Sequence, residues 1–273
     1  MTITTQTGRR AWDAIVADPA STLLCSDFDG VLSPIQADPD TASAAPETVA
    51  ALNRLGTKLG KIAVVTGRVA RKAVELGSFE KHDGLAEMSV LGLYGQERWD
   101  AATGEYREPE PPEGIAGVKA ELPAVLAELG LANARVEDKR LSVGVHTREL
   151  PDAAGAFATL EQPIRSLAER HGLLVEPGRN VLEIRGPGSD KGDAVRALVA
   201  EVQPRTIIFA GDDLGDVAAF EAIARLREEG YEGLLICSGS DEQDALVALA
   251  DVVVPGPPGV AALLNDLADA LGA

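Results

Sequence analysis

The sequence predicts an α/β fold in which a doubly wound parallel sheet carries an inserted α+β domain. Apolar runs of strand length alternate with amphipathic helical stretches in the first and last thirds of the chain. This alternation is typical of a parallel sheet covered by helices on both faces. Residues 108–187 instead pair strands with helices over a shorter span. We therefore expect a core made of residues 1–107 and 188–273, with residues 108–187 as the inserted domain.

The core strands are expected at apolar runs that end in polar loops. These runs are residues 22–26, 61–66, 89–94, 205–211, 233–238 and 251–254. Amphipathic stretches predict helices at residues 46–59, 68–77, 190–202, 214–229, 241–250 and 259–271. Because the carboxyl ends of parallel strands share one edge of a sheet, we expect the ligand site in the loops at that edge.

The inserted domain begins with a stiff, charged, proline-rich linker at residues 108–114 and ends at Gly186-Pro187-Gly188. Between these points the pattern predicts helices at residues 115–129 and 153–170, and strands at residues 132–138, 141–148, 173–177 and 181–185. Strands combined with helices in this order predict a small α+β domain.

The composition is that of a soluble globular protein with a strongly acidic surface. The chain has 43 acidic against 25 basic residues, a net charge of −18, which disfavours binding to nucleic acid or to an anionic membrane. No run approaches the roughly 18 apolar residues of a membrane span, and residues 1–10 are too polar for a signal peptide. We expect a cytoplasmic enzyme in which Cys25 and Cys237 are buried core residues.

Two carboxylates one residue apart follow the strand at residues 22–26, in the segment Asp27-Phe28-Asp29-Gly30-Val31. Crowded acidic groups repel each other unless a cation or a shared proton compensates. Such a pair suits a nucleophilic Asp27, an acid/base Asp29 and a divalent metal. Taken in isolation, the segment also fits a turn with solvated Asp residues before glycine.

Two further segments offer groups that can bind a phosphate. The Thr66 hydroxyl and the backbone N–H groups of Gly67 and Arg68 follow a strand and precede a helix; the alternative is an ordinary helix-entry turn. Lys191 falls in the first turn of a helix, where a cation opposes the macrodipole and an anionic ligand would explain it. A solvated lysine beside Asp190 and Asp193 is the alternative.

Three acids, Asp212, Asp213 and Asp216, end the apolar strand at residues 205–211. Clustered carboxylate oxygens are the ligands that Mg²⁺ uses in proteins, with waters and phosphate oxygens completing the octahedron. An acidic helix cap is the alternative, and it explains one Asp better than three.

The order of these segments, DxDGV, TGR, DKG and GDDxxD, resembles that of the haloacid-dehalogenase-like (HAD) phosphohydrolases. Residues 92–97, 137–146 and 176–185 are similar to the GxHGxE, EDKxxSVxVH and PGKxVLExR stretches of trehalose-6-phosphate phosphatases. The resemblance spans about Leu23 to Val254. It implies a Rossmann-like HAD core with a mobile cap that closes over the substrate.

The chain departs from that family's usual pattern at several positions. It has Val31 where the family more often has Thr, Tyr94 where it has His, and Arg179 where it has Lys. The usual TDE after GDDx is Gly215-Asp216-Val217, and the usual arginine-proline pair is Arg185-Gly186-Pro187. Since Tyr94 and Arg179 fall at positions expected near the substrate, these two changes leave the exact sugar open.

The resemblance and the residues together imply a Mg²⁺-dependent phosphomonoesterase for a phosphorylated disaccharide, with trehalose 6-phosphate as the expected substrate. Asp27 is expected to become an aspartyl-phosphate, and Asp29 to protonate the leaving sugar and then activate water. Mg²⁺ would bind Asp27, the Asp29 carbonyl and Asp212, with Asp213 and Asp216 as further or outer ligands. Residues expected to bind the phosphoryl oxygens are Thr66, Gly67, Arg68 and Lys191.

The resemblance assigns sugar recognition to the inserted domain. Arg179 and Glu183 are expected to bind sugar hydroxyls, and Glu137, Lys139, His146 and Arg148 are further candidates. The protein would then work in series with a trehalose-phosphate synthase-like glycosyltransferase. Two alternatives stay open: a phosphatase for a trehalose-like pseudo-disaccharide phosphate such as validoxylamine A 7'-phosphate, and a non-catalytic sugar-phosphate-binding module. Intact Asp27, Asp29, Lys191 and Asp212 argue against the second alternative.

Overall fold

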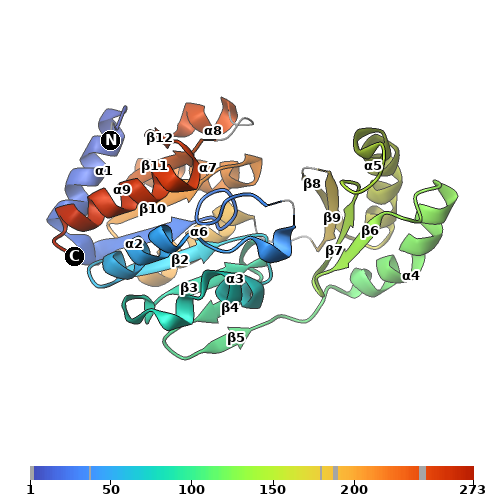
Figure 1. Cartoon of the computed structure of the whole chain (residues 1–273), viewed down its shortest axis with the longest axis horizontal. Helices are drawn as coiled ribbons and strands as arrows, with labels where there is room; N and C mark the ends of the chain where they lie inside the picture. The colour runs from blue at the N-terminus through green and yellow to red at the C-terminus, as the bar shows by residue number, and fades with distance from the viewer. Residues whose placement is uncertain (1–2, 37, 179, 187–189, 240–243) are drawn as a thin grey trace. The chain divides into compact units, whose positions relative to one another are not determined.

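The computed structural model describes residues 3–36, 38–178, 180–186, 190–239 and 244–273. The chain divides into two compact units, one made of Met1–Glu108 and Ser189–Ala273 and the other of Pro109–Gly188. The second unit differs from the predicted insert, residues 108–187, by one residue at each end. Figure 1 shows the helices and strands of both units.

The first unit is built on a sheet with the strand order β12-β11-β10-β1-β2-β3-β4-β5 (Figure 1). The strands from β12 to β3 pair in parallel, which confirms the predicted doubly wound sheet. Their bounds are Thr22–Ser26 for β1, Lys61–Val65 for β2, Ser89–Gly92 for β3, Thr206–Gly211 for β10, Glu232–Ser238 for β11 and Val252–Val254 for β12. Strand β3 is shorter than predicted because Leu93–Gly95 turns away as a short 3-10 segment.

Two strands at one edge of the sheet and one helix were missing from the sequence prediction. The strands β4 (Glu97–Asp100) and β5 (Glu105–Arg107) pair antiparallel and extend the otherwise parallel sheet at this edge. Each is too short for its alternation of buried and exposed side chains to stand out in the sequence. The helix α1 (Gln6–Ala17) begins at the N-cap Thr5 and buries Ala11 and Ile15.

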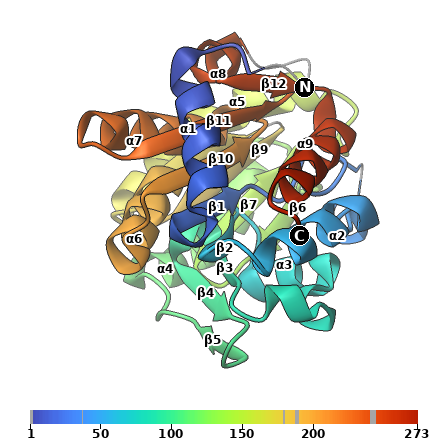
Figure 2. The same cartoon turned by 90° about the vertical axis from the view of Figure 1, so that its left-hand side faces the viewer.

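Helices cover both faces of this sheet, as Figure 2 shows. One face packs on α1, α2 (Pro46–Gly56), α3 (Ala70–Gly77) and α9 (Gly256–Ala270). The other packs on α6 (Lys191–Val202), α7 (Val217–Glu228) and α8 (Asp244–Leu249). Successive residues of a strand contribute side chains to opposite faces of the sheet. Because helices cover both faces, nearly all of these side chains are buried, and the strands are apolar throughout. Cys25 and Cys237 are buried thiols, as predicted.

Short 3-10 turns complete the first unit, at Pro19–Ser21, Pro39–Thr41, Phe79–Lys81, Asp83–Leu85, Leu93–Gly95 and Leu214–Asp216. Among the helices of the described residues, none has the length and apolar character needed to cross a membrane.

Strand register in the first unit determines which loops meet. Ser26 of β1 lies opposite Ala210 of β10 on one side and Val64 of β2 on the other. The backbone N–H of Asp27 continues this pairing and donates to the carbonyl of Ala210 at 2.9 Å. The loops after β1, β2 and β10 therefore start side by side at the carboxyl edge of the sheet.

The second unit is an antiparallel sheet with one face covered by two helices. Its strands are β6 (Arg135–Asp138), β7 (Ser142–His146), β8 (Leu174–Gly178) and β9 (Val181–Arg185), in the order β6-β7-β9-β8. The helices α4 (Glu113–Glu128) and α5 (Ala153–Arg170) bury an apolar core against β7 and β9. These are the elements that the sequence predicted, with strands shortened by up to three residues at an end.

Candidate active site

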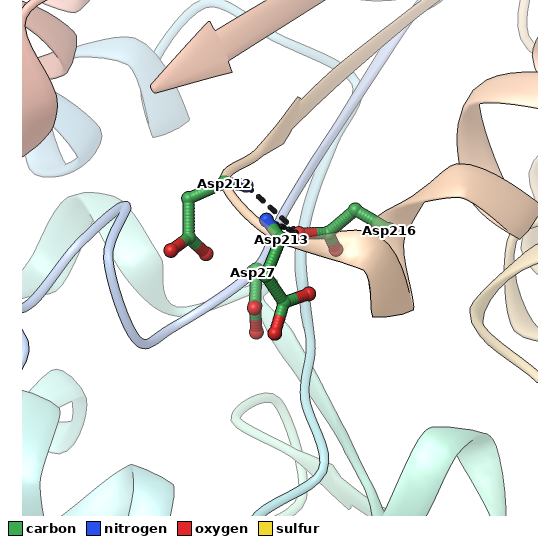
Figure 3. A group of neighbouring side chains, drawn as sticks. All are labelled: Asp27, Asp212, Asp213 and Asp216. Carbon is green, nitrogen blue, oxygen red and sulfur yellow. Dashed lines mark hydrogen bonds between the residues drawn. The ribbon is translucent and has the colours of Figure 1, made fainter. Parts of the chain in front are cut away.

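Four acidic side chains meet at the carboxyl edge of the first unit's sheet. Asp27 follows β1, while Asp212, Asp213 and Asp216 come from the turn after β10, and their carboxylate oxygens all lie within 4.8 Å of one another. Figure 3 shows the carboxylates of Asp27 and Asp213 close together, with Asp216 pointing toward the backbone of Asp212. The structure thus brings together the first and last acidic segments singled out in the sequence.

The loop after Asp27 needs a glycine at position 30. Gly30 has φ +68°, and a Cβ atom there would lie 1.9 Å from Oδ2 of Asp212. The Gly30 carbonyl accepts a hydrogen bond from the Ser238 hydroxyl at 2.5 Å, while the N–H groups of Leu32 and Ser33 both donate to the Phe28 carbonyl. The Asp212 carboxylate therefore packs directly against the backbone of the loop that carries Asp27.

Lys191 is a buried cation between two carboxylates. Its Nζ lies 2.7 Å from Oδ2 of Asp27 and 2.7 Å from Oδ1 of Asp216. A capping box formed by Asp190 and Asp193 starts α6 and makes Lys191 its first residue. The two carboxylates explain how a lysine is stable in a turn where the helix macrodipole disfavours it.

Asp216 holds this arrangement in place with both of its oxygens. Its Oδ1 accepts from Lys191, and its Oδ2 accepts from the backbone N–H groups of Asp212 at 2.8 Å and Asp213 at 3.2 Å. Asp216 thus orients Lys191 and shapes the turn that presents Asp212. The sequence suggested a metal-binding role for Asp216 but not this one.

The cluster carries more negative charge than Lys191 can offset. Burial and the neighbouring Asp27 raise the pKa of Asp212 to about 9. Burial likewise raises the pKa of Asp27 well above its usual range, although Lys191 opposes this. For Lys191 itself, burial lowers the pKa, but Asp216 and Asp27 more than reverse this and leave it well above its ordinary value. Buried oxygen ligands with uncompensated charge fit a hard divalent cation.

Asp29 is held by an arginine rather than by the acidic cluster. Arg68 Nε donates to Oδ2 of Asp29 and Nη2 donates to Oδ1, both at 2.7 Å. The third nitrogen, Nη1, donates to the Pro39 carbonyl at 2.8 Å, and the guanidinium lies 5.4 Å from the centre of the Phe28 ring. The sequence predicts that Arg68 binds the phosphoryl oxygens, and this stays a prediction; in the structure Arg68 binds the loop after β1.

Thr66 and Gly67 lie at the same edge. Thr66 is buried, its N–H donates to the Leu91 carbonyl at 3.0 Å, and its hydroxyl oxygen accepts from the Arg68 N–H at 3.2 Å. The Tyr94 ring lies over Gly67, because a Cβ atom added there would be 2.9 Å from the Tyr94 hydroxyl.

Glu97 is a buried acidic residue for which the sequence motifs predicted no role. Its Oε2 accepts the N–H of Ala70 at 2.9 Å, at the first residue of α3. It thereby supplies the N-terminal cap that Val69 does not provide through its side chain. The similarity of residues 92–97 to a family motif was the only sequence signal for this residue.

The other predicted residues belong to the second unit. Glu183 is buried; its Oε2 lies 2.9 Å from Lys139 Nζ, and its Oε1 accepts from the Ser142 hydroxyl at 2.7 Å. Glu137 contacts His146 Nε2 at 2.9 Å, and this hydrogen bond lowers the pKa of Glu137. Glu137 and Glu183 are both in register with Gly144, so they share a face. Arg148 lies in the turn after β7, and Arg179 lies outside the described residues.

Comparisons with known proteins identify the family of this chain. A trehalose-phosphatase family profile matches residues 25–252. A probable trehalose-phosphate phosphatase of Sinorhizobium fredii is 34% identical over 218 residues, 78% of each chain. The trehalose-6-phosphate phosphatase of Escherichia coli is 31% identical over 204 residues, 73% of each chain.

A solved structure supports the fold at lower sequence identity. The C-terminal domain of Candida albicans trehalose-6-phosphate phosphatase superimposes with a TM-score of 0.77 at 19% identity and covers 98% of both chains. The match extends over the first and second units alike, and the profile covers the segments that carry Asp27, Thr66, Lys191 and Asp212. The chain therefore belongs to the trehalose-phosphatase family of phosphatase enzymes.

Proposed function

We propose that this protein hydrolyses trehalose 6-phosphate to trehalose and inorganic phosphate through an aspartyl-phosphate. The observation that carries the proposal is the buried Asp27–Lys191–Asp216 chain at the sheet edge, with Asp212 beside it. It combines a nucleophilic carboxylate with a cation that can offset charge on a phosphoryl group. The substrate follows from the names of the family and of the two relatives.

In the first step, a carboxylate oxygen of Asp27 attacks phosphorus in line as the bond from phosphorus to the sugar oxygen breaks. Asp29 transfers a proton to the departing oxygen, so the sugar leaves as an alcohol. The Asp29 side chain is 39% exposed, so it can take up this proton from solvent. Its pairing with Arg68 has to loosen before the proton is transferred.

In the second step, Asp29 removes a proton from water while the water oxygen attacks phosphorus and the bond from phosphorus to Asp27 breaks. Phosphate leaves and both carboxylates return to their starting states. Lys191 and the Thr66 hydroxyl bind the phosphoryl oxygens, together with backbone N–H groups at Gly67.

We propose Mg²⁺ as the cofactor, held by Asp27, Asp212 and Asp213 with the Asp29 carbonyl. The close oxygen donors and the raised pKa of Asp212, about 9, support this choice. Bound there, the ion would neutralise charge on the phosphoryl oxygens.

We assign selection of the sugar to the second unit. The buried Glu183 forms an ion pair with the half-buried Lys139, and Glu137 and His146 form a second pair on the same sheet face as Glu183. Paired, oriented polar groups suit sugar hydroxyls. Arg148 and Arg179 stay candidates from the sequence.

A cytoplasmic location and action after a trehalose-phosphate synthase-like glycosyltransferase are likewise proposals from the sequence.

A phosphate-release screen tests the function. The purified chain with Mg²⁺ is offered trehalose 6-phosphate, glucose 6-phosphate, validoxylamine A 7'-phosphate and p-nitrophenyl phosphate. We expect the highest kcat/KM on trehalose 6-phosphate. A clear preference for the pseudo-disaccharide phosphate would move the assignment to the alternative substrate, and no release from any ester would support the non-catalytic alternative.

A further inference from the structure

The turn after β3 has an unusual backbone. Leu93 has φ +47°, Tyr94 has φ +60°, and Gly95 has φ +94°. Glycine adopts such values freely, but leucine and tyrosine adopt them at a cost in free energy, and a bulky residue there is a genuine outlier. Strained backbone of this kind persists where the surroundings hold it, and it concentrates at functional sites.

The surroundings that hold this turn are the phosphate-binding loop. The Leu93 N–H donates to the Arg68 carbonyl at 2.9 Å, and the Tyr94 N–H donates to the Thr66 carbonyl at 3.0 Å. The Leu93 side chain is buried, and Glu97 at the end of the turn caps α3. The turn is therefore tied to the loop that contains Thr66 and Arg68 on both sides of Gly67.

The strained conformation places a phenol at this loop. A Cβ atom on Gly67 would lie 2.9 Å from the Tyr94 hydroxyl and 3.0 Å from the ring carbon that bears it. A residue larger than glycine at position 67 would displace the ring. Tyr94 is half-buried, so part of the residue is exposed to solvent.

The position of the phenol suggests which part of a substrate it meets. Thr66 precedes Gly67 and faces the phosphoryl group in the proposed reaction. Arg68 follows it and binds Asp29, which serves the leaving oxygen. The part of the substrate bonded to that oxygen is the sugar. A phenol offers an apolar ring face to sugar carbons and a hydroxyl that can donate and accept hydrogen bonds.

We propose that Tyr94 is a specificity-determining residue of the first unit, binding the phosphorylated sugar ring next to the ester oxygen. This inference rests on the proposed function and extends it, since the first unit then also takes part in sugar recognition. The competing explanation is that the ring only covers Gly67 and stabilises the turn.

The test compares Tyr94→Phe with the unchanged protein on trehalose 6-phosphate and on p-nitrophenyl phosphate, whose leaving group has no hydroxyls. Phenylalanine keeps the ring over Gly67 and removes the hydroxyl. We expect kcat/KM to fall roughly ten-fold on trehalose 6-phosphate, mostly through KM, and to change less than about two-fold on p-nitrophenyl phosphate. Tyr231→Phe, before β11 at the opposite end of the strands, is the matched control and should change neither.

A second variant, Tyr94→Asn, separates binding from stability, because asparagine tolerates a positive φ. We expect its melting temperature to equal or exceed that of the unchanged protein while KM for trehalose 6-phosphate rises. Equal losses on both substrates, or no loss in either variant, would overturn the role of Tyr94. If the unchanged protein releases no phosphate from trehalose 6-phosphate, the proposed function fails first. The same comparison is then made on the sugar phosphate that it does hydrolyse.

Discussion

The guanidinium of Arg68 donates two parallel hydrogen bonds to the carboxylate of Asp29, each 2.7 Å long. Such bidentate pairs fix orientation as well as distance. Arg68, two residues after Thr66, therefore fixes the orientation of the carboxylate that we propose as the acid/base group. This makes Arg68 a positioning residue for Asp29.

Replacing Arg68 with Lys should mainly impair hydrolysis of esters with poor leaving groups. Lysine keeps the charge but loses the planar fork that orients Asp29. We expect kcat/KM to fall on the order of 100-fold for trehalose 6-phosphate, because its alkoxide must be protonated as it leaves. The fall should be much smaller for p-nitrophenyl phosphate. The control is Arg71→Lys, since Arg71 stacks on Tyr106 at 3.9 Å. Equal losses on both esters would place Arg68 on the phosphoryl group instead.

Asp27→Asn should abolish turnover while the protein still folds. Asparagine cannot form the aspartyl-phosphate, so kcat should fall by at least about 1,000-fold. Lys191 keeps its contact with Asp216, so the variant should still fold, but the lost pair with Asp27 should lower its melting temperature. Asp13→Asn, on the exposed side of α1, is the matched control. Beryllium fluoride with Mg²⁺ should form a complex with the unchanged protein that Asp27→Asn cannot form. Substantial turnover by that variant would exclude the covalent mechanism.

The acidic cluster should make stability depend on pH and on Mg²⁺. The pKa of Asp212 is raised to about 9. Between about pH 4 and that value, the folded metal-free protein keeps a proton that the unfolded chain has released. Its stability should therefore fall as pH rises through this window. Mg²⁺ offsets the charge, so it should raise the melting temperature more at pH 8 than at pH 5.

Asp212→Asn should weaken both the pH dependence and the Mg²⁺ effect in the same thermal melts. EDTA should stop turnover of the unchanged protein and Mg²⁺ should restore it. Ca²⁺ should inhibit, because its larger coordination shell disturbs in-line attack. Full activity after EDTA treatment would contradict the assigned cofactor.

Asp216→Asn should destabilise the fold. The change weakens the buried pair with Lys191 and leaves that cation less compensated. Breaking a buried ion pair by removing one partner costs about 3–5 kcal/mol of unfolding free energy. Urea unfolding measures this directly. Asp266→Asn, at an exposed position of α9, should change the free energy by less than about 0.5 kcal/mol. A similar small change at Asp216 would mean that Lys191 is held mainly by Asp27.

Glu183→Gln should lower activity on trehalose 6-phosphate much more than on p-nitrophenyl phosphate. Glutamine keeps an oxygen for the Ser142 hydroxyl but removes the charge that orients Lys139. Glu176→Gln is the control, because Glu176 lies opposite Glu183 in the sheet but pairs with Arg185. Equal losses on the two esters would show that Glu183 supports the fold or the chemical step, and its role in choosing the sugar would have to be abandoned.

Features of this protein that depend on short stretches of sequence could be predicted without the structure. Strands buried on both faces have to be apolar throughout, so β1, β2, β10 and β11 were predictable from short runs. The carboxylates of Asp27 and Asp212 also stood out, because each directly follows such a strand, and Gly30 lies in the loop after Asp27. The hairpin of β4 and β5 was missed, since its strands are too short to show a period and lie at a sheet edge.

The ion pairs of the site, in contrast, could be identified only from the folded structure. Asp29 and Arg68 are 39 residues apart, and Lys191 and Asp216 are 25 apart, so neither pairing leaves a local pattern. From the sequence we predict that Arg68 binds the phosphate and that Asp216 is a metal ligand, because these roles suit the charges of the two side chains. The register of β1 between β2 and β10 places these loops side by side. Because a buried charge without a partner is costly, each charged side chain there forms an ion pair with the nearest opposite charge.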